Sequence, residues 1–186
     1  MSARSAVGET VTRTLPSGGE LARLGALLLA ALLLQTTVAP NLRILGASPD
    51  FALIIVVSVA LLRGAQVGAV FGFLTGVLVG LALLEPLGMS ALVLVVVGYF
   101  AGRYAETADL SAPVAPLVGV FAATLLANIL FATLQYLLER QVPFGFWVGR
   151  VLIPSLVLNT LLATVFYLVI RSVLGGKGVL RADQAA

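Results

Sequence analysis

The sequence predicts an all-α membrane protein, folded as a compact bundle of six transmembrane helices with both termini in the cytoplasm. Three observations lead to this fold class. The chain is 60% hydrophobic and only 10% charged, whereas a soluble domain needs a larger charged surface. Its apolar runs are separated by short polar connections. Its basic residues gather at the ends of those runs, as is typical of membrane helices.

The apolar runs divide the 186-residue chain into one membrane domain and two tails. Residues 1–20 are expected to form a disordered cytoplasmic tail, and residues 172–186 a short basic cytoplasmic tail. The six-helix transmembrane domain occupies residues 21–171 and contains no internal linker or repeat array. The expected spans are residues 21–38, 51–62, 67–84, 87–100, 117–138 and 151–170.

The first span resembles a signal peptide in its charged flank and Leu-rich centre. Pro40, however, directly follows the small-residue site at which cleavage would occur, so we interpret the span as a retained helix. Ala22, Ala26 and Ala30 recur at every fourth position. They give this helix a face of small residues that another helix can approach closely.

The second span is shorter than the approximately 20 residues that a membrane crossing requires. It lengthens if the Arg63 side chain extends to the membrane surface. Pro49 and Asp50 come directly before it. A carboxylate at this position meets the positive end of the helix dipole, so Asp50 is predicted to cap the helix.

Glycine recurs at every fourth position through the third span, at Gly64, Gly68, Gly72, Gly76 and Gly80. On a helix this spacing produces one ridge without side chains, along which a second backbone can come very close. The partner is either another helix of the same bundle or a second protein. The sequence predicts close packing and leaves both partners open.

Only Glu85 and Pro86 separate the third span from the fourth. So tight a hairpin makes the two helices antiparallel neighbours. Glu85 is expected to be a solvated helix end without chemistry, because no partner acid or base lies near it in the sequence.

Polar side chains occur in the fifth and sixth spans, at Asn128, Gln135, Asn159 and Thr164. Such side chains usually turn inward and find partners on neighbouring helices, which predicts a polar seam between these two spans. The seam either joins the helices or lines a ligand cavity.

The connection between the fifth and sixth spans is aromatic, with Phe144, Phe146 and Trp147 close to Pro143. Aromatic residues at this position are typical of the membrane–water interface. Contact with an external partner is the other interpretation.

The orientation follows from the basic residues, because cytoplasmic segments carry an excess of Lys and Arg. Eight basic residues fall on the side of the termini and three on the opposite side. The first group is Arg4, Arg13, Arg23, Arg63, Arg103, Arg171, Lys177 and Arg181, and the second is Arg43, Arg140 and Arg150. Both termini are therefore expected in the cytoplasm.

Several functions are excluded or disfavoured. The chain has no cysteine and no histidine, which removes thiol and imidazole catalysis and nearly all zinc chemistry. It has no phosphate-binding glycine loop followed by Lys-Ser or Lys-Thr. We therefore expect no catalytic residue, no metal, no cofactor and no nucleic-acid partner.

The second to fourth spans resemble the bacterial rod-shape-determining MreD family. The similarity covers about a third of the chain, and length, span count and short tails agree elsewhere. It is carried by Pro49-Asp50-Phe51, Ala60-Leu61-Leu62 with Gly64, Gly72-Phe73 with Gly76, Leu87-Gly88 with Ala91-Leu92, and Gly98-Tyr99. One departure is Gly80, where the family often has an aspartate, so an acidic function there is not carried over.

The resemblance implies a non-enzymatic inner-membrane scaffold of the elongation machinery. Its implied partners are MreC, most directly, the actin-like MreB, and the RodA and penicillin-binding synthases of peptidoglycan. A homodimer is also compatible with the sequence.

Two other classes are weighed against this scaffold. The first is the substrate-binding membrane subunit of an energy-coupling-factor vitamin transporter, whose first helix has an alanine pattern similar to Ala22, Ala26 and Ala30. The sparse external connections argue against a vitamin pocket. The second is an intramembrane enzyme, which would need a charged group in mid-membrane, and no predicted span has one.

Overall fold

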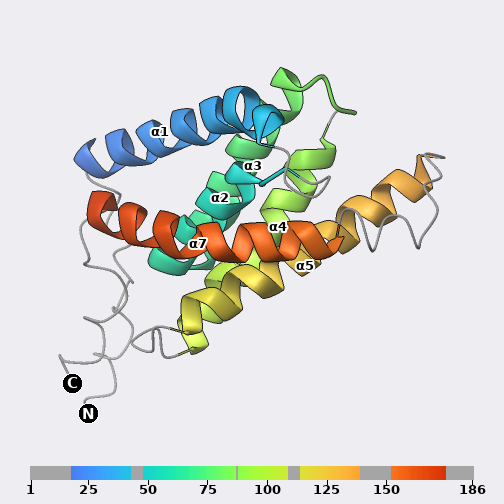
Figure 1. Cartoon of the computed structure of the whole chain (residues 1–186). Coiled ribbons are helices and arrows are strands. Elements are labelled where there is room, and N and C mark those ends of the chain that lie inside the picture. Colours follow the sequence, from blue (N-terminus) through green and yellow to red (C-terminus); the bar gives the residue numbers. More distant parts are fainter. Residues whose placement is uncertain (1–17, 43–47, 87, 109–113, 139–151, 175–186) are drawn as a thin grey trace, which may run out of the picture.

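A computed structural model of the chain describes residues 18–42, 48–86, 88–108, 114–138 and 152–174, and these residues form helices and short connections without a strand (Figure 1). The predicted all-helical membrane class is confirmed. The elements are α1 (Gly18–Leu33), η1 (Leu34–Val38), η2 (Ala39–Asn41), α2 (Phe51–Arg63), α3 (Ala65–Ala82), α4 (Met89–Thr107), α5 (Ala115–Leu137) and α7 (Ile153–Leu174).

Five of these segments are long and apolar enough to cross a membrane: residues 18–41, α3, α4, α5 and α7. The first combines α1 with the π-helical turn η1 and the 3₁₀ turn η2. Each segment agrees with a predicted span to within a few residues, apart from the C-terminal end of α4. The predicted second span is the shorter apolar helix α2, of 13 residues.

Helix α4 continues to Thr107, beyond residue 100, where the predicted fourth span ends. The predicted end of this span was wrong. Charged residues end the apolar run, but the helix continues through them. Arg103 and Glu106, one turn apart, form an ion pair of 2.6 Å between Nη1 and Oε2 that adds a small stabilisation.

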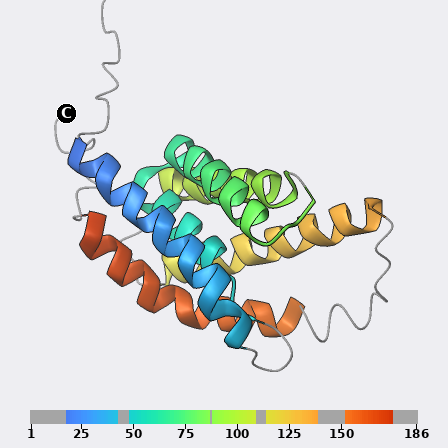
Figure 2. The same cartoon turned by 90° about the horizontal axis from the view of Figure 1, so that it is seen from above.

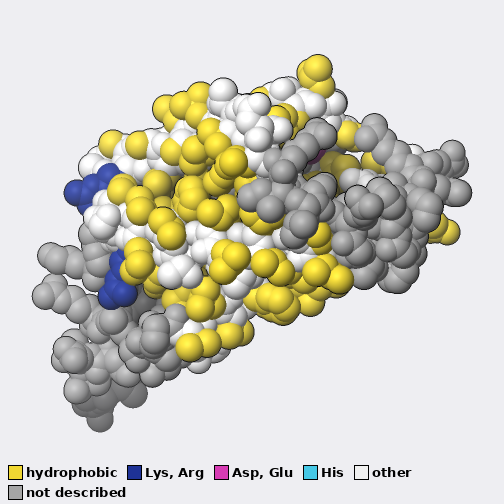
Figure 3. Space-filling model, in the orientation of Figure 1, with side chains coloured by type: hydrophobic (Ala, Val, Ile, Leu, Met, Phe, Trp, Pro, Cys, Tyr) yellow, Lys and Arg dark blue, Asp and Glu magenta, His cyan; other side chains and the backbone are white. Residues whose placement is uncertain are grey.

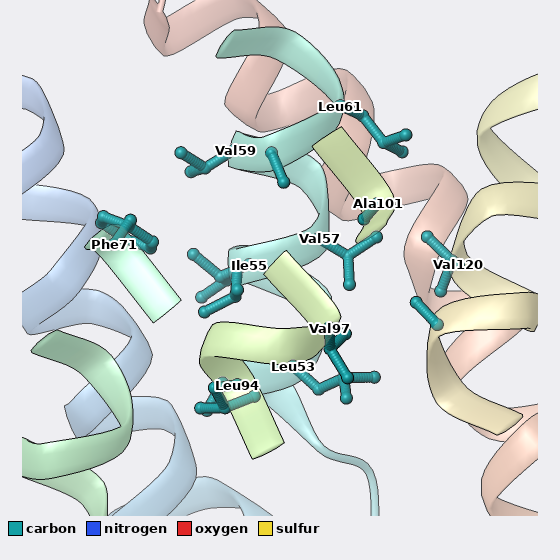
Figure 4. Close-up of a cluster of buried hydrophobic side chains, with 14 of the residues drawn as sticks. Leu53, Ile55, Val57, Val59, Leu61, Phe71, Leu94, Val97, Ala101 and Val120 are labelled. Atoms are coloured by element: carbon teal, nitrogen blue, oxygen red, sulfur yellow. The ribbon is translucent and has the colours of Figure 1, made fainter. Parts of the chain in front are cut away.

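Helix α2 is the centre of the bundle. Its residues from Phe51 to Leu61 are all buried, on every side of the helix. In Figure 2, α1 lies in front of α2, with α3 on one side and α7 on the other. Figure 4 shows apolar side chains of α2 pointing away from the helix on two sides, toward Phe71 of α3 and toward Val120 of α5. The core is therefore built around one short helix that is surrounded by longer ones.

Helices α3 and α4 form the predicted antiparallel hairpin. The turn between them contains two left-handed positions, Leu84 with φ 53° and Gly88 with φ 84°. The Glu85 amide donates to the Gly80 carbonyl over 3.0 Å and closes the end of α3. The Ser90 hydroxyl, in the first turn of α4, donates to the Glu85 carboxylate, so Glu85 links the turn to the start of α4.

The outer faces of the long helices are apolar. Among the described residues in view, Figure 3 shows hydrophobic side chains spread over the long helices and Lys and Arg side chains at the end where α1 begins and α7 finishes. Such a continuous exposed apolar surface is typical of a protein surrounded by lipid.

Candidate functional site

Three glycines of the ridge lie against the backbone of α4. A methyl group added at Gly68 would meet the Gly98 carbonyl oxygen at 2.5 Å, and one added at Gly72 would overlap the Leu94 carbonyl. At Gly76 it would overlap the Ala91 backbone. The middle of the ridge is therefore an internal contact within the α3–α4 hairpin. This is one of the two partners that the sequence left open.

The two ends of the ridge have other roles. Gly64 lies between α2 and α3 with φ 85° and ψ 178°, a conformation that L side chains rarely adopt. A methyl group added at Gly80 would stand 3.8 Å from the Ser90 Cβ, at ordinary contact distance. Gly64 thus permits a sharp turn, whereas Gly80 has room for a small side chain.

Helix α4 contributes glycines that were not predicted to take part in this contact. A methyl group at Gly98 would overlap the Gly68 carbonyl, and one at Gly102 would overlap the backbone of Gly64 and Ala65. Their spacing of four, the same as in α3, was the signal available in the sequence. The close approach therefore depends on small residues from both helices.

The alanine face of α1 is not used for packing among the described residues. Ala22 and Ala26 are exposed and Ala30 is half-buried, whereas Leu27 and Ala31 of the same helix are buried. The stripe predicted from the spacing thus lies on the outside of the bundle, where a partner or lipid can reach it.

At the other end of the bundle, Asp50 caps α2. Its Oδ1 accepts a hydrogen bond of 2.9 Å from the Leu53 amide, and the preceding Pro49 is buried. The predicted capping geometry is present. Burial raises the pKa of Asp50, which precedes the helix, from 3.8 to about 6, and the Leu53 amide opposes this rise.

Two other elements complete this cap. The Asp50 amide donates to Asn159 Oδ1 of α7 over 3.0 Å, and the Ala52 amide donates to Gln35 Oε1 of η1 over 3.2 Å. The first amides of a helix have no partner within the helix. Helix α2 therefore obtains partners for them from both ends of the chain. Gln35 was not predicted at this site, although it is the only amide side chain in the first span.

These polar groups surround a cavity of about 150 Å³. Its walls come from η1, the segment before α2, and α5 and α7. They are formed by Gln35, Ser48, Pro49, Asp50, Leu53, Asn128, Phe131, Ser155 and Asn159. The volume suits a few water molecules or one small polar group.

The predicted polar seam is only partly formed. Asn128 and Asn159 share the cavity, and the Asn128 amide also donates to the Thr124 carbonyl over 2.9 Å. Gln135 is half-buried and does not line the cavity. Thr164 is exposed, so its predicted place in the seam was wrong. Five positions beyond Asn159, Thr164 faces away because consecutive helical residues are about 100° apart.

The opposite end of the bundle is held by charged groups. Arg63 Nη1 lies 2.9 Å from Glu20 Oε1 at the start of α1, and Arg63 Nη2 donates to the Leu174 carbonyl of α7 over 3.0 Å. Glu106 Oε1 accepts from the Ala65 amide over 3.0 Å and caps α3. The first residues of α1 and the last of α7 therefore meet at one end of the bundle.

Within the described ranges, no group of three or more Asp and Glu residues is positioned to hold a metal ion. The predicted aromatic connection of Phe144, Phe146 and Trp147 lies outside the described residues.

The helices and their contacts define an all-helical, multi-pass membrane protein whose buried polar groups join one helix to another. A family model described as rod shape-determining protein MreD matches residues 21–175. The chain belongs to the MreD family of rod shape-determining proteins. No curated protein and no solved structure matches it.

Proposed function

We propose that this protein is a non-enzymatic inner-membrane scaffold of the rod-shape machinery, linking MreC and MreB to the RodA and penicillin-binding synthases of peptidoglycan. The observation that carries the proposal is the family match, which extends from the first residues of α1 to the end of α7. The roles of the polar groups support it. Asp50, Asn159 and Glu106 all accept hydrogen bonds from helix starts.

The orientation that we propose has both termini in the cytoplasm. The described basic side chains favour it, because they gather at one end of the bundle. Arg63 contacts the start of α1 and the end of α7, and Arg23 and Arg171 lie near those same helix ends. Arg103 pairs with Glu106 beside the start of α3. The opposite end of the bundle carries the acidic residues Asp50 and Glu85. Basic groups concentrate on the cytoplasmic side of membrane proteins.

MreC is the partner we expect to bind directly. Because Gly68, Gly72 and Gly76 are occupied within the bundle, the exposed alanine face of α1 is the better candidate for its membrane helix. Small residues at spacing four allow close helix approach. Bulk at this face should therefore weaken the complex without disturbing the fold.

Complementation and co-purification together test this function. In a rod-shaped bacterium depleted of its own MreD, the intact chain should restore rod shape and retain MreC after detergent extraction. Ala26→Leu should reduce MreC retention while the melting temperature stays the same. Leu168→Ala, on the exposed face of α7, is the matched control. Rod growth restored by a chain that never retains MreC would contradict the scaffold proposal.

The vitamin-transporter alternative receives no support from the cavity beside Asp50. Its volume of about 150 Å³ is below the roughly 300–1,000 Å³ of small-molecule sites. Nanomolar retention of thiamine, riboflavin or biotin by the purified chain would favour the transporter instead.

A further inference from the structure

A lateral groove of about 630 Å³ runs between α1 and α3. Most of its walls are apolar side chains, from Leu24 and Leu28 of α1 and from Val70, Phe71 and Leu74 of α3. Gly25 also lines it, and a side chain added there would meet nothing within 4 Å. The groove is therefore empty beside Gly25, and a larger side chain at this position would occupy it.

The polar residues of this groove collect at one end. They are Glu20, Arg63 and Gln66. The Glu20 and Arg63 side chains are 2.9 Å apart and remain 27% and 18% exposed. The groove thus has an apolar channel and a mouth carrying one negative and one positive group, which is the chemistry of an amphiphile with a zwitterionic head.

The length of the groove indicates a single leaflet. Along α3 it extends from Gln66 to Leu74, about 12 Å at a rise of about 1.5 Å per residue. Half of the hydrocarbon core is about 15 Å thick. A membrane helix of a partner would need a groove about twice as long, whereas one acyl chain below its headgroup fits this one.

We propose that the groove between α1 and α3 binds one phosphatidylethanolamine molecule from the leaflet at the end of the bundle where α1 begins. One acyl chain lies along Gly25, Leu28 and Val70. The phosphate accepts from the Arg63 guanidinium, whose five N–H donors exceed its two contacts with Glu20 and Leu174. The primary ammonium donates to the Glu20 carboxylate.

The headgroup follows from the pair of charges. Phosphatidylglycerol would bring its negative phosphate against Glu20 without an ammonium to compensate. Phosphatidylcholine has a cation but no N–H to donate to a carboxylate. Phosphatidylethanolamine offers both an acceptor for Arg63 and donors for Glu20, and such charge-assisted hydrogen bonds are the stronger ones.

Native mass spectrometry of the full chain, titrated separately with the three lipids, tests the proposal. We expect one bound phosphatidylethanolamine at lower lipid concentration than either other lipid requires. Gly25→Phe should weaken this binding about tenfold or more, because its ring displaces several methylenes from apolar contact. Leu29→Phe, at an exposed position of α1 that does not line the groove, should leave it unchanged. Glu20→Gln should lose the preference for phosphatidylethanolamine over phosphatidylglycerol.

Two results would overturn the proposal. The first is equal affinity of the intact chain for the three lipids. The second is phosphatidylethanolamine binding that survives Gly25→Phe. If that variant keeps its lipid but loses a single-span protein partner, the groove is a helix-binding site instead. Circular dichroism checks the fold of each variant.

Discussion

The backbone amide of Asp50 donates a 3.0 Å hydrogen bond to the side-chain oxygen of Asn159, 109 positions later in the chain. Asn159 is 1% exposed, so its side chain is shielded from bulk solvent. Asn159→Ala should lower the free energy of unfolding by about 1–3 kcal/mol, the cost of leaving a buried donor without a partner. Thermal unfolding in detergent measures this loss, and Thr164→Ala, on the exposed face of the same helix, should cause almost none. Equal losses in the two variants would contradict the stabilising role of the Asp50–Asn159 hydrogen bond.

Burial of Asp50 predicts a dependence of stability on pH. Its pKa is raised from 3.8 to about 6 in the folded chain, so the folded state holds a proton that the unfolded state has released between these values. Stability should therefore fall as pH rises from about 4 to 6. Asp50→Asn keeps an oxygen for the Leu53 amide and should remove this part of the pH profile. Parallel profiles for the two chains would contradict the assignment to Asp50.

The α3–α4 contact predicts that two glycines of one ridge differ sharply. Gly72→Ala places a methyl group into the Leu94 backbone and should destabilise by about 1–3 kcal/mol, the usual cost of overpacking. Gly80→Ala has ordinary contact distance to Ser90 and should be neutral or slightly stabilising, because alanine favours the helix. Melting temperatures of the two variants in the same detergent provide the comparison. A ridge that tolerates both equally would not be a backbone contact.

Orientation can be measured with single cysteines, since the chain has none. Gly19 lies at the start of α1, and Leu84, 90% exposed, lies in the turn between α3 and α4 at the other end of the bundle. In intact cells Leu84→Cys should react with a membrane-impermeant maleimide, and Gly19→Cys should react only after the membrane is opened. The reverse pattern would invert the proposed topology.

Local patterns in the sequence predicted much of this fold. The recurrence of glycine at every fourth position of α3 predicted a close helix contact, and Asp50 after Pro49 predicted a helix cap. Both predictions depend only on helix geometry. The sequence did not indicate which helix each face of small residues contacts. Nothing local says that Gly72 meets Leu94 of its own chain, or that the exposed alanines of α1 are left without such a contact.

The errors have the same origin. Thr164 was grouped with Asn159 by composition, yet the buried face of α7 is given by Asn159, Ala163, Tyr167 and Ile170, at helical spacing. Applying that period to the polar residues would have excluded Thr164. Gln35 and the cavity beside Asp50 could not be predicted, because they arise where segments from distant parts of the chain meet.

Helix α2 has a consequence for how the protein is made. Its 13 residues reach about 20 Å, short of the approximately 30 Å of a hydrocarbon core, and its sides are covered by α3, α4, α5 and α7. All four of these helices are synthesised after it. During translation α2 has neither the length to remain stably across the bilayer nor, apart from α1 and η1, the neighbours that will enclose it. Its final position is therefore secured only when later helices arrive, and a chain truncated before α7 would leave Asp50 without Asn159 and the centre of the bundle open to lipid.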